Sequence, residues 1–340
     1  MKAFQIEREG HTRLVNVAAP EVGDDEVLLR VRTVGFCGSD LNTYRGLNPL
    51  VTYPRIPGHE VAATVERVGG RVPGDELRAG MDVTLLPYTA CGTCPACRRG
   101  RANACRDNET LGVQRDGALT ELVVVPWQKV LPAGGLSARA LALVEPLSVG
   151  FHAADRGRVA ADDTVLVIGC GAVGLGAIAG AAQRGARVIA VDVDADKLAL
   201  ARRSGAAEVV DTSVTRLHDR VRELTNGDGA DVVIEAVGLP ETFVAAVSEA
   251  AFTGRVVYIG YAKAPVTFDT SQFVKKELDI LGSRNATAHD FRAVMTMLRA
   301  GTFPVDAAVS RIVTLDDAGA ALHEWSASPA TVTRIHVDVA

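Results

Sequence analysis

The sequence predicts an α/β protein in which a β-rich part is combined with a doubly wound parallel sheet. The first 150 residues carry strand-like patterns separated by Gly and Pro turns. From Asp163 onward, short apolar runs alternate with helical stretches. A chain of 340 residues favours two domains, because single hydrophobic cores rarely grow beyond about 250–300 residues. We therefore expect a β-rich domain and a domain of βαβ units.

The β-rich part shows the period of two that a half-buried strand requires. Val27, Leu29 and Val31 alternate with neighbours that include Arg30 and Arg32. Similar patterns predict further strands, and the three expected segments are 26–34, 61–68 and 119–125.

The second part has six short apolar runs, and helical or turn-rich stretches separate them. This is the pattern of a parallel sheet with crossover helices. The expected strands are 164–168, 187–192, 209–211, 231–235, 255–260 and 278–282. Near the C-terminus, 318–325 has its apolar residues on one helical face, and 332–339 alternates like a strand. A last strand that rejoins the first domain would make that domain discontinuous.

Composition and charge exclude several classes of protein. Hydrophobic residues make up 48% and charged residues 23%, which argues against a disordered or fibrous chain. The net charge of -5 lacks the basic excess of a nucleic-acid binder. The first residues carry charges of both signs and no apolar signal, so we expect a cytoplasmic protein. The uncharged stretch 165–182 is about long enough for a membrane span, but its five glycines favour a strand that turns into a helix, and we expect no membrane partner.

Four cysteines lie close together, at the spacing C-x2-C-x2-C-x7-C. Cys91, Cys94, Cys97 and Cys105 could surround one tetrahedral zinc ion in a closed, structural site. Two disulfides are the alternative, which a reducing compartment disfavours. Four-cysteine zinc also occurs in nucleic-acid-binding ribbons, but the arginines beside this cluster fit a solvated loop face better.

A glycine motif follows the expected strand 164–168. Gly169, Gly171 and Gly174 satisfy G-x-G-x-x-G, and a small-residue helix comes next, so we expect a dinucleotide pyrophosphate at the helix N-terminus. Asp192 ends the next strand 18 residues after Gly174, where a carboxylate accepts hydrogen bonds from ribose. No Arg at 193–196 is present to pair with a 2′-phosphate, so NAD is preferred over NADP. We count Lys197 among the expected cofactor-binding residues.

Further segments carry possible metal ligands. Cys37-Gly-Ser-Asp, Gly58-His59-Glu60, the four-cysteine lobe, Glu145-Pro-Leu-Ser and the glycine motif occur in this order. Their order and approximate spacing resemble those of the zinc-containing medium-chain dehydrogenases over essentially the whole chain. The resemblance implies a GroES-like catalytic domain (1–150 and 290–340) interrupted by a Rossmann NAD-binding domain (151–289). It also implies two zinc ions per chain and a homo-oligomer, either a dimer or a tetramer.

The same resemblance implies roles for individual residues. Cys37 and His59 match catalytic zinc ligands. Glu60 matches a carboxylate that binds the metal directly or can move onto it. Glu145 sits where polyol and threonine dehydrogenases have Glu, linked to zinc directly or through water. Asp40 matches a carboxylate that orients the ligand His.

Ser39 matches the hydroxyl that first accepts the substrate proton. Many relatives then have a His five positions after the metal Cys, but this chain has Asn42. An amide cannot titrate near neutral pH, so the next step of the proton relay is in doubt.

Substrate residues are expected around Tyr44, Arg45, Arg284 and Asn285. The segment Tyr-Arg-Gly-x-Asn-Pro is similar to that of bacterial sugar-acid dehydrogenases of the L-galactonate and L-gulonate type. Either arginine could bind a substrate carboxylate or hold substrate hydroxyls, or could instead form an ion pair at the domain interface. The resemblance therefore favours oxidation of a secondary alcohol in a polyol or sugar acid, with L-threonine 3-dehydrogenase or sorbitol dehydrogenase as alternatives.

Two other hypotheses remain at this point. A zinc-free quinone reductase of the same superfamily would lack the ligand set that this chain has. A non-catalytic, NAD-responsive zinc-binding protein would use the four-cysteine lobe for interaction. The number of bound zinc ions separates these hypotheses from the enzyme.

Overall fold

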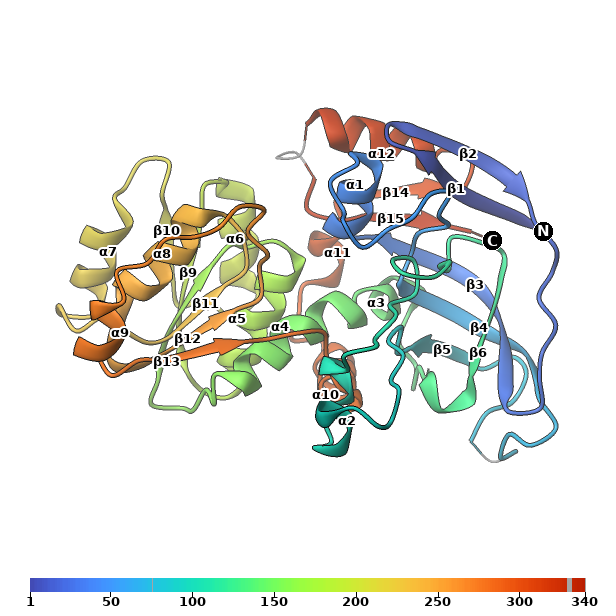
Figure 1. Ribbon diagram of the computed structural model, residues 1–340, viewed down its shortest axis with the longest axis horizontal. Helices are drawn as coiled ribbons and strands as arrows, with labels where there is room; N and C mark the ends of the chain where they lie inside the picture. The colour runs from blue at the N-terminus through green and yellow to red at the C-terminus, as the bar shows by residue number, and fades with distance from the viewer. Residues whose placement is uncertain (75, 329–331, 340) are drawn as a thin grey trace. The chain divides into compact units, whose positions relative to one another are not determined.

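The computed structural model describes residues 1–74, 76–328 and 332–339 (Figure 1). It divides into two compact units, which we call the β-rich unit and the parallel-sheet unit. The β-rich unit comprises Met1–Glu145, Met295–Ala300 and Val305–Ala340, and the parallel-sheet unit comprises Pro146–Val294 and Gly301–Pro304. The expected GroES-like ranges include 75, 329–331 and 340, which lie outside the described residues.

The β-rich unit is built on a seven-stranded sheet in the described part of the chain. The order is β14-β15-β3-β4-β5-β7, and β6 also pairs with β3. Bounds are β3 (Glu26–Phe36), β4 (Glu60–Val68), β5 (Asp82–Leu85), β6 (Leu122–Pro126), β7 (Val130–Pro132), β14 (Arg311–Thr314) and β15 (Ile335–Asp338). The strands expected at 26–34 and 61–68 are confirmed, while the one expected at 119–125 begins later, at Leu122.

The last strand, β15, pairs antiparallel with β3, so the C-terminal segment belongs to the same sheet as the N-terminal strands. A hairpin of β1 (Lys2–Arg8) and β2 (His11–Asn16) is tied to the unit by the bond from Phe4 N–H to Leu119 O, at 2.8 Å. Phe4, Phe36 and Leu29 are among the fully buried side chains of this core.

Helices in the β-rich unit are short. They are α1 (Gly38–Tyr44), α2 (Pro95–Arg98), η1 (Ala102–Ala104), η2 (Trp127–Lys129), α3 (Ala138–Ala142), α11 (Val305–Ala308) and α12 (Ala318–Ala327). Helix α12 confirms the amphipathic stretch 318–325, because Ala318, Ala321, Leu322 and Trp325 are its buried face.

The parallel-sheet unit has the strand order β10-β9-β8-β11-β12-β13. From β8 the chain winds outward first to β9 and β10, and then in the other direction to β12 and β13. Right-handed crossovers therefore place helices on both faces of the sheet (Figure 1). The strands are β8 (Thr164–Ile168), β9 (Arg187–Asp192), β10 (Glu208–Asp211), β11 (Ala230–Glu235), β12 (Ala250–Tyr258) and β13 (Asp279–Gly282).

Helices α5 (Ala172–Gln183), α6 (Ala195–Arg203), α7 (Leu217–Leu224), α8 (Pro240–Glu249) and α9 (Ser271–Lys275) belong to this unit. Helices α4 (Val144–Arg156) and α10 (Ala288–Arg299) extend from one unit into the other along the chain. Close packing of α4 on α5 needs glycine: a Cβ at Gly176 would lie 2.3 Å from Leu147 O. The sequence-based strands agree closely here, except that β12 runs over Ala250–Tyr258 where the expected strand is 255–260.

The uncharged stretch 165–182 is divided between β8 and α5. Among the described residues we find no helix with the length and hydrophobicity that a membrane span requires.

Candidate functional site

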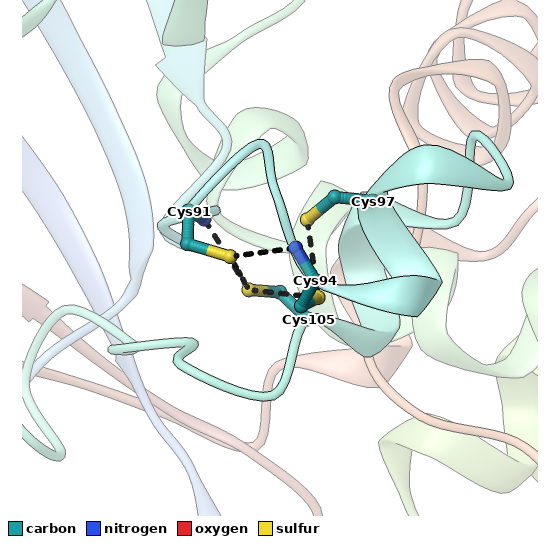
Figure 2. Close-up of side chains that lie close together, drawn as sticks. All are labelled: Cys91, Cys94, Cys97 and Cys105. Carbon is teal, nitrogen blue, oxygen red and sulfur yellow. Dashed lines mark hydrogen bonds between the residues drawn. The ribbon is translucent and has the colours of Figure 1, made fainter.

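The four cysteines of the expected structural site converge in the β-rich unit (Figure 2). The Sγ atoms of Cys94 and Cys97 are 3.6 Å apart, those of Cys91 and Cys105 are 3.6 Å apart, and those of Cys94 and Cys105 are 3.9 Å apart. A disulfide requires about 2.05 Å, and all four cysteines are free thiols. Sulfurs at this spacing suit a tetrahedral metal rather than the two disulfides considered as an alternative.

The electrostatics of this lobe also favour a cation. Backbone N–H groups of Arg106 and Cys97 lower the pKa of Cys94 to about 6. Burial and the neighbouring Cys94 sulfur raise the pKa of Cys97 to about 12. Four such thiols cannot all ionise beside one another unless a positive ion neutralises them, and the thiolate is the metal-binding form.

A second group of ligands forms where β3 ends and β4 begins. Cys37 directly follows β3 and is the N-cap of α1, and His59 directly precedes β4. Gly35 and Glu60 are register partners in the two strands, and a Cβ at Gly35 would lie 2.1 Å from Glu60 Oε2. The ligand atoms of Cys37, His59 and Glu60 all lie within 4.8 Å of one another. The structure thus brings together three of the four predicted ligands.

His59 is in a state that suits metal binding. It is 4% exposed, and its Nδ1 has no hydrogen-bond partner among the described residues. Burial alone would lower the pKa of His59, but Cys37, Asp40 and Glu145 together raise it well above its usual value. A divalent ion would satisfy both the negative charge and the unpartnered nitrogen, so the residues fit a zinc ion.

Asp40, the residue expected to orient His59, is buried beside it. Its Oδ2 accepts a hydrogen bond from Cys37 N–H at 2.8 Å, while its Oδ1 has no partner among the described residues. Burial raises the pKa of Asp40 to about 6, against the opposing charge of His59. Asp40 therefore supports the Cys37 turn and is coupled to His59 by charge, and its orienting role stays a prediction.

Arg334, which the sequence analysis did not identify, neutralises Glu60. Its Nη1 lies 2.5 and 2.7 Å from the two carboxylate oxygens and also donates to Phe36 O at 2.8 Å. Arg334 lies in the polypeptide just before β15, far from Glu60 in sequence. The only sequence signal for this role was that an Arg occurs within the segment 332–339, in which apolar residues alternate with other residues.

Glu145 lies near the three ligands without belonging to their compact group. It is 5% exposed, and its Oε1 accepts a hydrogen bond from the buried hydroxyl of Tyr88. Burial raises the pKa of Glu145, and the charge of His59 opposes that rise. Tyr88 is a second residue that sequence motifs did not reveal.

The proposed proton acceptor and two expected substrate residues lie on or beside α1. Ser39 Oγ is buried without a hydrogen-bond partner among the described residues. The hydroxyl of Tyr44 pairs with His323 Nδ1 at 3.0 Å, and Arg45 Nε donates to Ser326 Oγ at 3.0 Å. Both of these side chains therefore engage α12.

The glycine turn in the parallel-sheet unit has the expected form. Gly169 has φ +100°, and a Cβ at Gly174 would lie 1.9 Å from Gly169 O, so both positions require glycine. A Cβ at Gly171 would meet nothing within 4 Å, which leaves open space in front of the N-terminus of α5. Anions bind readily at such a terminus.

Asp192 is the last residue of β9, and its carboxylate holds this turn by hydrogen bonds to backbone N–H groups. Its Oδ2 accepts from Cys170 N–H at 2.8 Å, and its Oδ1 accepts from Val193 N–H at 2.8 Å. Lys197 lies in the first turn of α6, where its N–H donates to Asp194 Oδ1 at 3.0 Å. Burial raises the pKa of Cys170, so this thiol is unreactive and only fills space inside the turn.

The remaining two expected substrate residues follow β13 in the parallel-sheet unit. Asn285 has a positive φ of 53°, a conformation that Asn tolerates better than most residues. Arg284 and Asn285 therefore belong to a different unit from Cys37 and His59.

Comparisons with known proteins agree with both units. Residues 23–135 match the family model of the alcohol dehydrogenase GroES-like domain, and residues 172–300 match that of the zinc-binding dehydrogenase. The L-galactonate-5-dehydrogenase of Escherichia coli K12 is 36% identical over 292 residues, which cover 84% of each chain. The sorbitol dehydrogenase of Bacillus subtilis 168 is 32% identical over 289 residues, covering 83% of this chain and 81% of the relative.

Two solved structures are similar over nearly the full length. A short-chain alcohol dehydrogenase from Escherichia coli CFT073, complexed with NADH, has a TM-score of 0.91 and 27% identity and covers 100% of this chain and 99% of its own. A zinc-binding dehydrogenase from Sinorhizobium meliloti 1021, bound to NADP, has a TM-score of 0.90 and 31% identity, with 99% of each chain covered. These similarities confirm the predicted combination of a GroES-like domain with a Rossmann-type parallel sheet.

Proposed function

Because this chain belongs to the zinc-dependent medium-chain alcohol and polyol dehydrogenases, we propose that it oxidises a secondary alcohol of a sugar acid to a ketone with NAD. The observation that carries the proposal is the cluster of Cys37, half-buried, with the buried His59 and Glu60, where a histidine nitrogen lacks any partner in the described structure. Within the family, the finer proposals concern the ligand set, the cofactor and the substrate.

We assign Cys37, His59 and Glu60 to the catalytic zinc, with Glu145 close enough to act directly or through water. The cysteines Cys91, Cys94, Cys97 and Cys105 hold the second, structural zinc. A bound zinc would supply Lewis-acid chemistry that lowers the pKa of a substrate hydroxyl, and a bound nicotinamide would supply the hydride acceptor.

The chain's own residues then handle charge and protons. Ser39 Oγ, buried without a partner among the described residues, would accept the hydroxyl proton of the substrate while its own proton passes on to solvent water. Asp40 holds the turn on which Cys37 and Ser39 lie. Arg334 compensates the charge of Glu60, so that this carboxylate can stay ionised in a buried site.

The preference for NAD rests on Asp192. Its carboxylate ends β9 and would repel a 2′-phosphate, and positions 193–196 carry no cationic residue. Since one similar structure is bound to NADP, the alternative cofactor must be tested. Initial rates with NAD and NADP at equal concentration decide it: an NADP preference would refute the assignment.

A sugar acid is favoured over a neutral polyol because the L-galactonate-5-dehydrogenase is among the relatives and because arginines such as Arg45 and Arg284 are the residue type that recognises a carboxylate bidentately. Purified enzyme should be assayed with L-galactonate, sorbitol and L-threonine side by side. The highest kcat/KM on L-galactonate supports the proposal. Activity on sorbitol alone would instead indicate a sorbitol dehydrogenase, and activity on L-threonine alone an L-threonine 3-dehydrogenase.

We also propose a homo-oligomer, either a dimer or a tetramer. Light scattering coupled to size-exclusion chromatography measures the mass directly, and a mass of 35.7 kDa, that of one chain, would refute this part.

A further inference from the structure

The four-cysteine lobe is joined to the rest of the β-rich unit by a short two-stranded stem. Leu111 N–H donates to Pro87 O at 2.9 Å and Thr89 N–H donates to Glu109 O at 3.1 Å, so 87–89 runs antiparallel to 109–111. Glu109 N–H adds a bond to Thr89 Oγ1 at 2.7 Å. The cysteine cluster begins two residues beyond this stem, where Cys91 N–H lies 3.3 Å from Cys105 Sγ.

Tyr88 is the middle residue of the first stem strand, opposite Thr110. Its side chain is 5% exposed and does not face the cysteines: its hydroxyl donates to Glu145 Oε1. A buried tyrosine hydroxyl needs such a partner, and a buried carboxylate needs such a donor. The bond therefore fixes the orientation of Glu145 from the stem.

The second stem strand continues directly into contact with the His59 turn. Gly112 follows Leu111 with φ +77°, and a Cβ there would lie 2.5 Å from Gly58 N. Gly58 immediately precedes His59. Both strands of the stem thus lead to a residue of the candidate catalytic centre, one through a hydrogen bond and the other through backbone packing.

We propose that Tyr88 is a positioning residue for Glu145 and that it transmits the state of the four-cysteine lobe to the catalytic centre. When the lobe holds its metal, Cys91 and Cys105 are clamped and the stem keeps its pairing. Tyr88 then keeps one carboxylate oxygen of Glu145 occupied and leaves the other for the catalytic site. The proposal rests on the assignment of Glu145 to that site in the proposed function.

The test uses the full-length protein with cobalt in place of zinc, because visible absorption of cobalt reports its ligands without any turnover. Tyr88→Phe removes only the hydroxyl. We expect a changed cobalt spectrum and a loss of catalytic-metal affinity of about 10- to 100-fold, the range for residues that support metal ligands. The variant should also lower kcat more than it changes KM.

Tyr53→Phe is the matched control, because the Tyr53 hydroxyl also forms a hydrogen bond in the β-rich unit, to Thr43 O. It should leave the cobalt spectrum and kcat as in the wild type. Thermal unfolding of both variants excludes a gross loss of fold.

Thr89→Val tests the transmission step, since it deletes the side-chain bond of the stem while keeping a β-branched residue. It should alter the cobalt spectrum in the wild-type background but not in the Tyr88→Phe background. Equal effects in the two backgrounds would overturn the route through Tyr88.

The outcomes separate this inference from the proposed function. A wild-type protein that binds two metal ions and oxidises the alcohols, but whose cobalt spectrum is unchanged by Tyr88→Phe, overturns the role of Tyr88 alone. A changed spectrum in an enzyme inactive on every alcohol supports the role of Tyr88 and refutes the proposed function. Metal uptake only by the four-cysteine lobe refutes both.

Discussion

Arg334 forms a buried ion pair with Glu60, and the two side chains are only 6% and 0% exposed. Glu60 is thus contacted from one side by a guanidinium and lies within ligand distance of Cys37 and His59 on the other. A buried carboxylate without such compensation would be costly in free energy. The pair explains how Glu60 can remain near a metal centre that also contains a thiol and lies close to a second carboxylate.

Replacing Arg334 with Leu should destabilise the protein strongly. Removing one partner of a buried ion pair costs about 3–5 kcal/mol, because the other charge stays buried and unpaired. Urea unfolding measures this loss, which should be smaller with zinc bound, since the ion would compensate Glu60. Arg30→Leu is the control: Arg30 of β3 pairs with Glu66 of β4 in the same sheet, but both side chains are over 40% exposed, so its loss should cost less than about 1 kcal/mol. Equal costs for the two variants would show that the buried pair has no special role.

Cys37→Ser should remove the catalytic metal while leaving the fold intact. Cys37 supplies the thiolate of the cluster, and a serine hydroxyl is a poor replacement for it at neutral pH. Elemental analysis should show about two zinc ions per chain in the wild type and one in the variant, with turnover lost. Cys170→Ala, which removes a buried thiol outside both clusters, should retain both ions. Normal turnover of Cys37→Ser would refute the ligand assignment.

Asp192→Asn should weaken NAD binding. The amide keeps an acceptor for the Cys170 N–H bond but loses the charge that favours ribose hydroxyls and repels a 2′-phosphate. We expect KM for NAD to rise by about 10-fold, as for loss of a charged hydrogen bond, with activity on NADP improved relative to NAD. Asp211 ends the neighbouring strand β10 and bonds Ser213; Asp211→Asn should leave both constants unchanged. A similar effect from both variants would mean that the change is not specific to the cofactor.

His336 makes stability depend on pH. Burial, with the nearby charges of Arg334 and Arg139, lowers its pKa to about 3, and neither ring nitrogen has a hydrogen-bond partner among the described residues. Below the ordinary pKa of about 6.5 the unfolded chain binds a proton that the folded chain does not, so stability falls as pH decreases from 6.5 towards 3.

Between pH 7 and pH 5 this group should cost about 2 kcal/mol of stability. Urea unfolding of the wild type and of His336→Leu at both pH values isolates the contribution, because the other titrating groups are common to the two proteins. If the variant loses as much stability as the wild type on acidification, His336 is not the responsible group.

Local pattern was sufficient to predict much of the fold. The strands at Thr164–Ile168 and Arg187–Asp192 agree in both ends with the sequence analysis, because a buried parallel strand is a continuous apolar run that polar or Gly residues end. The strand expected at 255–260 begins earlier, at Ala250. Gly254 interrupts the apolar pattern there, and it lies in an irregular stretch where the register with β11 shifts between Ala250 and Arg255.

The candidate site likewise has residues that the sequence predicts and residues that it does not. Cys37, His59 and Glu60 stand in short motifs, so a resemblance could locate them. Arg334 lies 274 positions from Glu60 and Tyr88 lies 57 positions from Glu145, and no local pattern marks either contact. Partners of buried charges depend on how distant strands come together, which one sequence does not reveal.

The pairing of β15 with β3 has a consequence for biosynthesis. During translation, β3 leaves the ribosome some 300 residues before its neighbour β15. Residues 26–30 of β3 can pair with β6 early, but residues 33–36 must wait for β15 while the whole intervening parallel-sheet unit is made. That unit, nearly continuous in sequence, can fold first. An exposed strand edge invites intermolecular pairing, which makes nascent chains that stall before β15 the species most in need of chaperones.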